Sequence, residues 1–410
     1  MPDPLVVLGL WAAGGMITVG GALSLAELAA AIPETGGLYV YLREGWGRPA
    51  GFLFGWSQLV LIRASALGGI AIAFGDYCLG TFGIDPVTHQ MAARALAAGA
   101  LAFAAVVNIA GVNLGAAIVR LSTAAKFLAL AAIAISAFVL GGSHGATMAN
   151  LTTATESPIT VGNLGLALVG VLWAYDGVSD LSFVAGEVKE PHRNLPLAII
   201  TGAAAIVLIY LLVNVAYLYV LPIETVGRSP LVAADMMGVL VGQRGAVLVS
   251  MCVMISTFGA LNGIMLASPR VFFAMASDGL FFKSIAQVHP RYKTPHVAIL
   301  LTTLLGMVLV TSRSFEALTL LFVVANWPFY ALSVAAVYRL RRRRPDLPRP
   351  YKVIGYPVVP AIFIAAVVCF IGNALVHEPM STAVTFVLIL SGIPVYYLAF
   401  GSQRRRSVPL

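Results

Sequence analysis

The chain is built from runs of about 20 apolar residues, separated by short segments that contain proline, glycine and charged residues. A helical run of that length spans the hydrocarbon core of a bilayer. Lipid offers no hydrogen-bond partner to the backbone, so a spanning segment is either a helix or a strand of a closed barrel. The runs lack the strict alternation of barrel strands. Only 10% of the residues are charged, far fewer than in soluble domains. We therefore predict an all-α integral membrane protein.

Breaks at proline, glycine and charge clusters predict eleven spans. The eighth is short and runs almost directly into the ninth. The predicted spans are residues 5–32, 51–80, 92–112, 121–141, 161–186, 197–221, 245–275, 296–311, 316–338, 356–375 and 381–400.

Lysine and arginine are unevenly distributed between the two sets of loops, which predicts the orientation of the chain. The poor set holds Arg94, Arg228, Arg244 and Arg313. The positive-inside rule makes the rich set cytoplasmic. We expect a multi-pass protein of the cell membrane with a cytoplasmic C-terminus and an external Met1. The rich set holds Arg43, Arg48, Arg120, Lys189, Arg193, Arg270, Lys283, Arg291, Lys293, the cluster at 339–352 and residues 404–406.

Several function classes lack support in the sequence. The net charge of +8 comes from loop residues that set topology, so no nucleic-acid partner is expected. Cys78, Cys252 and Cys369 lie within apolar runs, and we predict no disulfide framework, metal site or cofactor. The six histidines fall in loops or at span ends and form no catalytic set, so no enzyme is predicted. The polar residues form no continuous stripe, as a channel would require.

A series of motifs follows the loops and span ends in a specific order. The series is Ala26-Glu27-Leu28, Pro33-x-x-Gly36-Gly37, Tyr39-Val40-Tyr41-Leu42-Arg43-Glu44, Gly51-Phe52-Leu53-Phe54-Gly55-Trp56, Trp173-Ala174-Tyr175-Asp176-Gly177, Gly186-Glu187-Val188-Lys189-Glu190-Pro191, Phe258-Gly259-Ala260-Leu261-Asn262-Gly263, Pro269-Arg270-Val271-Phe272 and Arg344-Pro345-Asp346-Leu347-Pro348. In this order the motifs resemble those of the amino acid–polyamine–organocation (APC) superfamily, and within it the bacterial L-type (LAT-like) transporters. The resemblance covers essentially the whole chain.

The resemblance implies a five-plus-five inverted-repeat (LeuT-type) transporter fold of twelve helices, with substrate held at the midplane by two broken helices. Residues 5–141 would be helices 2–5 of the first repeat, 161–338 the second repeat, and 356–400 two further helices. The family's first helix, with its Gly-Ser/Thr-Gly-Ile-like stretch, has no counterpart here. We expect the upstream reading frame to supply it.

The implied function is secondary active transport of amino acids by alternating access, through exchange or proton coupling. Two alternatives stay open, namely a permease for polyamines or other organic amines, and a truncated carrier that does not transport. Amino acid substrate and bilayer are the expected partners. Animal relatives join a heavy chain through a cysteine after the third helix. Residues 79–90 contain no cysteine, so no disulfide-linked heavy chain is expected.

The predicted span 161–186 contains the candidate substrate site. Asp176 and Gly177, followed by Asp180, make a poor helix interior in lipid, because glycine costs about 1 kcal/mol relative to alanine and an unpaired carboxylate costs more. A break there would free backbone N–H groups for a substrate carboxylate. The alternative is a kink whose two aspartates pair with neighbouring helices. The predicted substrate-binding residues are Trp173, Ala174, Tyr175, Asp176, Gly177 and Asn262; for Asn262, packing between helices is the competing reading.

Two basic residues lie within spans. Lys126 is six residues past Arg120, roughly 9 Å inside the helix, so its side chain can snorkel to the interface. The resemblance implies instead a coupling role, with Ser256, Thr257 or both as partners. Arg63 lies thirteen residues past Ala50, roughly 20 Å along its helix, where snorkelling fails.

Arg63 therefore needs a partner on another helix. We predict Glu27 or Asp180 for this role. A structural ion pair and a residue lining the transport pathway are equally open.

Overall fold

The computed structural model describes residues 2–155 and 158–400, and all regular structure within them is helical. The first half contains α1 Pro4–Ala31, α2 Leu38–Trp46, α3 Arg48–Ser57, the π-helical turn η1 Gln58–Ile62, α4 Arg63–Thr81, α5 Gln90–Ala110, α6 Val112–Leu140, and the 3₁₀ turns η2 Gly141–His144 and η3 Met148–Leu151. The middle contains α7 Val161–Ala174, α8 Asp180–Phe183, η4 Ala185–Glu187, α9 Pro191–Val220, α10 Ile223–Arg228 and α11 Val232–Val241. The last part contains α12 Gln243–Ala267, α13 Pro269–Ser277, α14 His296–Ser312, α15 Phe315–Arg343, α16 Val358–His377, α17 Pro379–Leu390 and α18 Gly392–Ala399.

The predicted all-helical membrane architecture is confirmed. In the described part of the chain, nine helical segments are long and apolar enough to cross a membrane. The two other predicted spans correspond to α14, which has 17 residues, and to the interrupted pair α7 and α8. The short helices α2, α10 and α11 lie between spans and were not predicted. The helix predicted at 121–141 begins earlier, at Val112.

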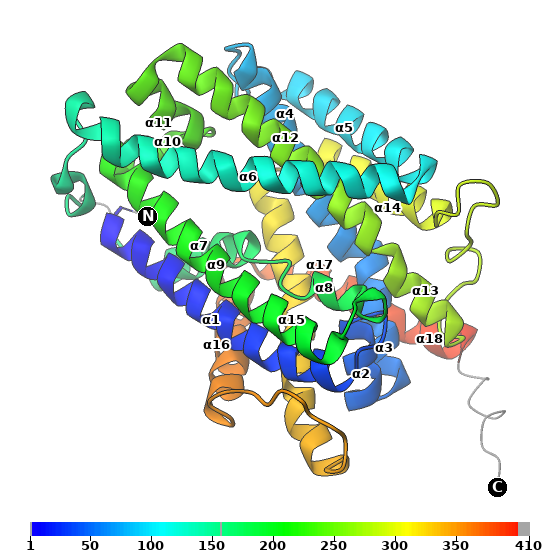
Figure 1. Ribbon diagram of the computed structural model, residues 1–410. Helices are drawn as coiled ribbons and strands as arrows, with labels where there is room; N and C mark the ends of the chain where they lie inside the picture. The colour runs from blue at the N-terminus through cyan, green and yellow to red at the C-terminus, as the bar shows by residue number, and fades with distance from the viewer. Residues whose placement is uncertain (1, 156–157, 401–410) are drawn as a thin grey trace, which may run out of the picture.

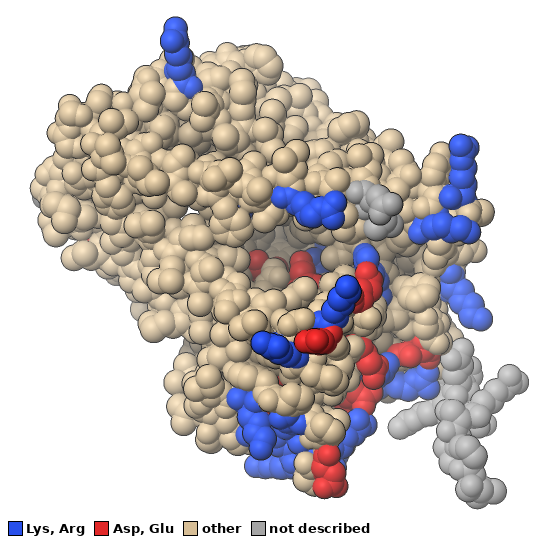
Figure 2. Space-filling view, viewed as in Figure 1, with Lys and Arg blue, Asp and Glu red and all other residues tan. Residues whose placement is uncertain are grey.

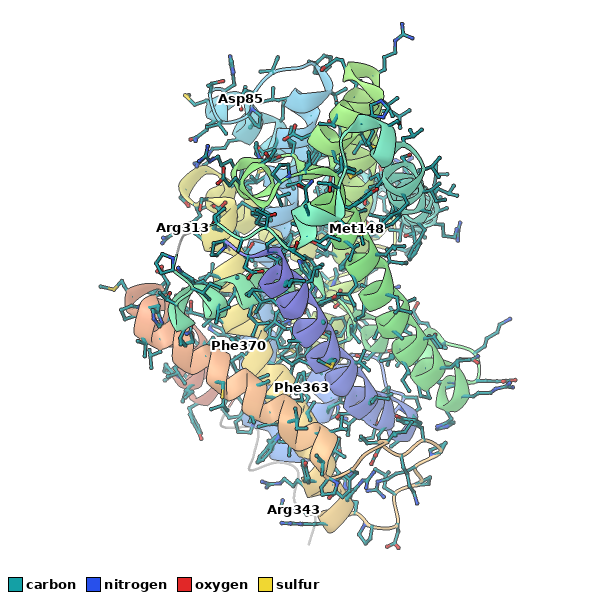
Figure 3. All side chains as sticks on the ribbon, turned by 90° about the vertical axis from the view of Figure 1, so that its left-hand side faces the viewer. Asp85, Met148, Arg313, Arg343, Phe363 and Phe370 are labelled. Atoms are coloured by element: carbon teal, nitrogen blue, oxygen red, sulfur yellow. The ribbon has the colours of Figure 1, made fainter. Side chains whose placement is uncertain are left out.

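The spans pack as two groups around α15. On one side α1 runs beside α9, while α12 packs against α4 and α6 (Figure 1). α6 and α12 approach closely where Gly259 faces Ser122, the small-residue contact that membrane helices favour. α15 contacts α1, α2, α4, α7 and α16. Trp327 of α15 stacks on Phe363 of α16 at 5.9 Å and meets Phe370 edge-on, so α16 is held by aromatic packing (Figure 3).

α2 is fixed beneath the bundle by a charge network with the end of α13. The Tyr39 hydroxyl and an Arg43 guanidinium nitrogen each donate to Asp278 Oδ2 at 2.5 Å. Burial of Tyr39 and its bond to the Asp278 carboxylate raise the pKa of the phenol far above its ordinary value. The network therefore ties α2 to the end of α13.

The buried carboxylate of Glu27 joins α1 to the segment after α15. Glu27 is 2% exposed and accepts from Arg341 Nη2 at 2.5 Å and from the Val353 backbone N–H at 2.7 Å, with Arg349 Nε at 3.5 Å. Of the two predicted partners of Arg63, Glu27 is therefore wrong. The reason is depth: Glu27 lies four residues from the end of α1, level with the end of α15, whereas Arg63 lies in mid-span.

We expect Glu27→Ala to lower the free energy of unfolding by about 3–5 kcal/mol, because it leaves two arginines without their buried partner. Glu34→Ala is the matched control. Glu34 also pairs with an arginine, Arg43, at 2.8 Å, but its side chain is 56% exposed, so its loss should cost at most about 1 kcal/mol. Unfolding in detergent measures both variants, and equal losses would contradict a buried clamp at Glu27.

Candidate functional site

The helix predicted at 161–186 is interrupted, as expected from Asp176 and Gly177. α7 ends at Ala174 and α8 begins at Asp180, with turns between them. Gly177 has φ +106°, in a region that side-chain-bearing residues rarely adopt. The Asp180 backbone N–H donates to the Gly177 carbonyl at 3.0 Å. Glycine at this position thus allows the chain to leave one helix axis and start another.

At the interruption, three consecutive backbone N–H groups donate no hydrogen bond to any described residue. Among the hydrogen bonds of the described residues, none is donated by the backbone N–H of Gly177, Val178 or Ser179. A Cβ built on Gly177 meets no atom within 4 Å, so open space lies beside the turn. Successive free N–H groups in a turn suit an anionic group.

The Asp176 carboxylate is held against α15. Its Oδ1 accepts from Tyr330 OH at 2.8 Å and from Asn326 Nδ2 at 3.2 Å. Tyr330 OH also contacts Ser179 Oγ at 3.0 Å. Within the described residues no hydrogen bond reaches Asp176 Oδ2, and the residue lines a small cavity of about 20 Å³ together with Tyr175 and Val178.

The hydroxyl of Tyr175 anchors the other side of the turn to α1. It donates to the Trp11 carbonyl at 3.1 Å, and its ring packs edge-on against Trp11 at 5.4 Å. The turn is therefore held between α1 and α15. Asn326 and Tyr330 were missed in the sequence, where the only signal is a polar side chain inside an apolar run.

Arg63 pairs with Asp180, the second of its two predicted partners. Arg63 Nη2 lies 3.0 Å from Asp180 Oδ1, and Arg63 Nε donates to Gln58 Oε1 at 2.7 Å. The guanidinium lies over the Phe183 ring, 5.1 Å from its centroid. Gln58 belongs to η1, a π-helical turn of the kind frequent at functional sites, and was not predicted.

The pairing of both aspartates with neighbouring helices was the kink alternative for this segment. The structure shows those pairings together with free backbone donors. The pairings of the kink alternative are thus observed, and substrate binding at the break stays a prediction.

Lys126 lies deeper in its helix than the sequence indicated. Because α6 begins at Val112, Lys126 is fourteen residues, or about 21 Å, from the helix start instead of roughly 9 Å. With 29 residues α6 is longer than the hydrocarbon core requires, so its start does not mark the interface, and the snorkelling reading stays open. The Lys126 side chain is half-buried and makes no hydrogen bond or ion pair with a described residue. Thr257 donates to the Val253 carbonyl, and no bond from Lys126 to Ser256 or Thr257 is formed. The coupling role stays a prediction.

Asn262 and Trp173 occupy different surroundings. Asn262 is fully buried, accepts from Asn108 Nδ2 at 2.8 Å and donates to the Phe258 carbonyl. Its amide thus joins α5 to α12, as the packing reading expects. Trp173, directly before Ala174 at the end of α7, meets Phe315 edge-on at 5.1 Å. Substrate contact by Asn262, Trp173 and Ala174 stays a prediction.

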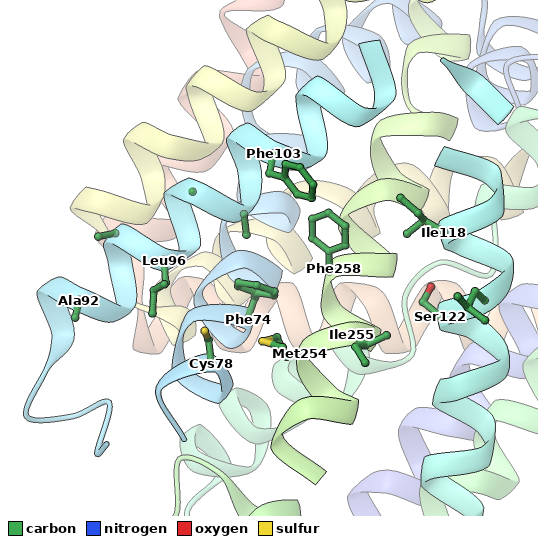
Figure 4. A pocket seen from close by; sticks show the side chains of 14 residues that line it. Phe74, Cys78, Ala92, Leu96, Phe103, Ile118, Ser122, Met254, Ile255 and Phe258 are labelled. Carbon is green, nitrogen blue, oxygen red and sulfur yellow. The ribbon is translucent and has the colours of Figure 1, made fainter. Parts of the chain in front are cut away.

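The surface is hollowed over the region of α7 and α8, between α6 and α9, with acidic and basic side chains visible at its base (Figure 2). A separate cavity of about 900 Å³ lies between α5, α6 and α12 (Figure 4). Its lining is apolar, including Phe74, Phe103 and Phe258, apart from the Ser122 hydroxyl, which donates to Val119 O. That apolar lining suits hydrocarbon and not a charged solute.

Comparisons with known proteins agree along the whole chain. A family model described as "Amino acid permease" matches residues 3–400. The serine/threonine exchanger SteT of Bacillus subtilis is 32% identical over 414 residues, which cover 99% of this chain and 90% of the relative. The human b(0,+)-type amino acid transporter 1 is 32% identical, with 98% and 82% covered. The human large neutral amino acids transporter small subunit 2 is also 32% identical, with 98% and 75% covered.

Proposed function

The chain belongs to the amino acid permease family, and on that premise we propose that it carries amino acids across the cell membrane by alternating access. It is a multi-pass membrane protein of a transporter family, not an enzyme family. The finer proposal is secondary active transport by exchange or by proton coupling. Relatives named as exchangers or transporters of amino acids support it.

The observation that carries the proposal is the set of free donors at residues 177–179 beside the half-occupied carboxylate of Asp176. An amino acid at neutral pH presents a carboxylate and an ammonium group on one carbon. The carboxylate would accept from the three backbone N–H groups, and the ammonium would donate to Asp176 Oδ2. The neighbouring charges of Arg63 and Asp180 cancel. The site as proposed therefore favours zwitterionic or cationic substrates over anionic ones.

A permease for organic amines is the second candidate, because Asp176 alone could bind an ammonium group. The two functions differ in their need for the backbone donors. Competition by an amino acid, its methyl ester and its decarboxylated amine discriminates between them. A carrier of amino acids should lose affinity for both analogues, whereas an amine permease should retain the decarboxylated compound.

For the fold we propose two inverted repeats. The spans of residues 5–141, namely α1, α3 with α4, α5, and α6, would match in order α9, α12 with α13, α14, and α15, which follow the interrupted helix within 161–338. The helices α16 to α18 would stand outside the repeats. In this arrangement the C-terminus is cytoplasmic. Reporter fusions after Arg193 and Arg344 should then read as cytoplasmic and one after Asn150 as external; an external signal at Arg344 would overturn the orientation.

The experiment that tests the function is uptake of labelled amino acids into proteoliposomes containing the purified chain. Liposomes preloaded with unlabelled amino acid test exchange, and empty liposomes with an imposed pH gradient test proton coupling. If Lys126 couples the two repeats, Lys126→Ala should abolish uptake or remove its pH dependence. Absence of uptake in every condition would contradict the proposal.

A further inference from the structure

A second polar cavity lies away from the interrupted helix, toward the end of the molecule that holds Asp85 and Arg313 and opposite Arg343 (Figure 3). Its volume is about 210 Å³, and it is lined by two carboxylates and two guanidinium groups. Asp76 comes from α4 and Arg94 from α5, while Arg313 directly follows α14 and Glu316 belongs to the first turn of α15.

Of the four charged residues, Arg313 and Glu316 are exposed and Asp76 and Arg94 are half-buried. In the described part of the chain, none of them forms a salt bridge. Arg94 donates to the Thr311 carbonyl at 2.8 Å, which fixes the guanidinium at the cavity without an ion pair to a described carboxylate. Two guanidinium groups and two carboxylates thus line one small cavity, and no ion pair is formed among them.

α4 carries one residue of this cavity, Asp76, and one residue of the pair at the interrupted helix, Arg63. The two residues are thirteen positions apart along α4, which corresponds to about 20 Å. Gly69 lies between them, and a Cβ built on it would be 3.5 Å from Trp173 Cζ2. The Trp173 ring therefore packs against α4 about midway between the cavity and the Arg63–Asp180 pair.

Two aromatic rings separate the two polar sites. Phe315 lines the cavity and meets Trp173 edge-on at 5.1 Å. Trp173 in turn is three residues before Asp176. A solute that leaves the cavity toward Asp176 would have to part this ring pair.

We infer that the cavity lined by Asp76, Arg94, Arg313 and Glu316 is a second binding site for a zwitterionic amino acid, occupied before Trp173 and Phe315 separate. The inference rests on the proposed function. The guanidinium groups would receive the substrate carboxylate and the two acidic groups its ammonium. At roughly 30 Å³ per water, 210 Å³ corresponds to about seven waters, a space suited to a small amino acid. The balanced charges disfavour an ion of a single sign.

The test is initial-rate uptake by Arg313→Gln and Glu316→Gln, measured separately from each face of the membrane in right-side-out and inside-out vesicles. Losing one hydrogen bond to a charged group should raise KM about tenfold from the face that bears the cavity, with kcat unchanged. KM from the opposite face should not change. A variant of the site at Asp176 would instead alter both faces.

Arg244→Gln is the matched control. Arg244 is exposed at the start of α12, at the same end of the molecule, since the neighbouring Gln243 side chain approaches Gly83 after α4. It does not line the cavity, so its KM should equal that of the wild type.

The outcomes distinguish this inference from the proposed function. If the wild type transports and both variants keep its KM on both faces, or raise it equally on both, the second site is excluded and the proposed function stands. If the wild type carries no amino acid, the proposed function fails and the second site fails with it. Gel filtration of each variant checks that it is folded.

Discussion

Gly177→Leu is expected to abolish amino acid binding while leaving the protein folded. The substitution acts in two ways. At φ +106° a leucine is strained by about 1–2 kcal/mol, which favours a different path for the turn and moves the free N–H groups of residues 177–179. Its side chain would also fill the open space beside the turn. Binding of labelled amino acid to detergent-purified protein should fall below detection.

Gly170→Leu is the matched control for this substitution. Gly170 belongs to α7, seven residues earlier, and a Cβ there also meets no atom within 4 Å. Its backbone is helical, so leucine is tolerated without strain. Binding should be unchanged in Gly170→Leu. Wild-type affinity in Gly177→Leu, or equal loss in both variants, would show that the turn is not where substrate binds.

Arg63→Leu is expected to abolish transport and to lower the free energy of unfolding by about 3 kcal/mol. The Arg63 side chain is 5% exposed, and its removal leaves Asp180 without its cation. This expected loss of stability is at the lower end of the range for breaking buried ion pairs, because the Asp180 side chain is 28% exposed and keeps part of its hydration. Thermal unfolding in detergent and proteoliposome uptake measure the two effects.

The double substitution Arg63→Leu with Asp180→Leu separates charge from packing. With both charges gone, stability should recover by most of the loss, because a paired hydrophobic replacement of a buried ion pair is often neutral. Arg270→Leu provides an exposed comparison, since its partner Glu187 is 57% exposed, and should cost at most about 1 kcal/mol. A double variant as unstable as Arg63→Leu alone would mean that Arg63 is needed for packing and not for charge balance.

The spans could be predicted because hydropathy reports burial in lipid directly. That Arg63 needs a partner on another helix could also be predicted, since depth along a helix follows from 1.5 Å per residue and places Arg63 in mid-span. Of the two candidates, Glu27 was wrong because it lies near the end of α1, where Arg341 and Arg349 reach it. The same depth argument misplaced Lys126, since the start of α6 at Val112 is apolar and carries no boundary signal.

The partners of Asp176 could not be predicted. Asn326 and Tyr330 are 150 and 154 residues away in sequence, and which neutral polar side chains meet across helices depends on helix rotation and packing. α2 was missed because nine residues with two charges give no spanning signal. The interruption itself was foreseen, because a carboxylate followed by glycine is costly inside a continuous helix in lipid.

The central claim is that the free backbone N–H groups of residues 177–179 bind the carboxylate of the substrate. Hydrogen–deuterium exchange of the peptide that contains these residues tests it most directly, with and without saturating amino acid and with the methyl ester as control. Exchange at 177–179 should slow with the amino acid and remain unchanged with the ester. If exchange there is the same with and without an amino acid that the protein demonstrably binds, the claim is contradicted.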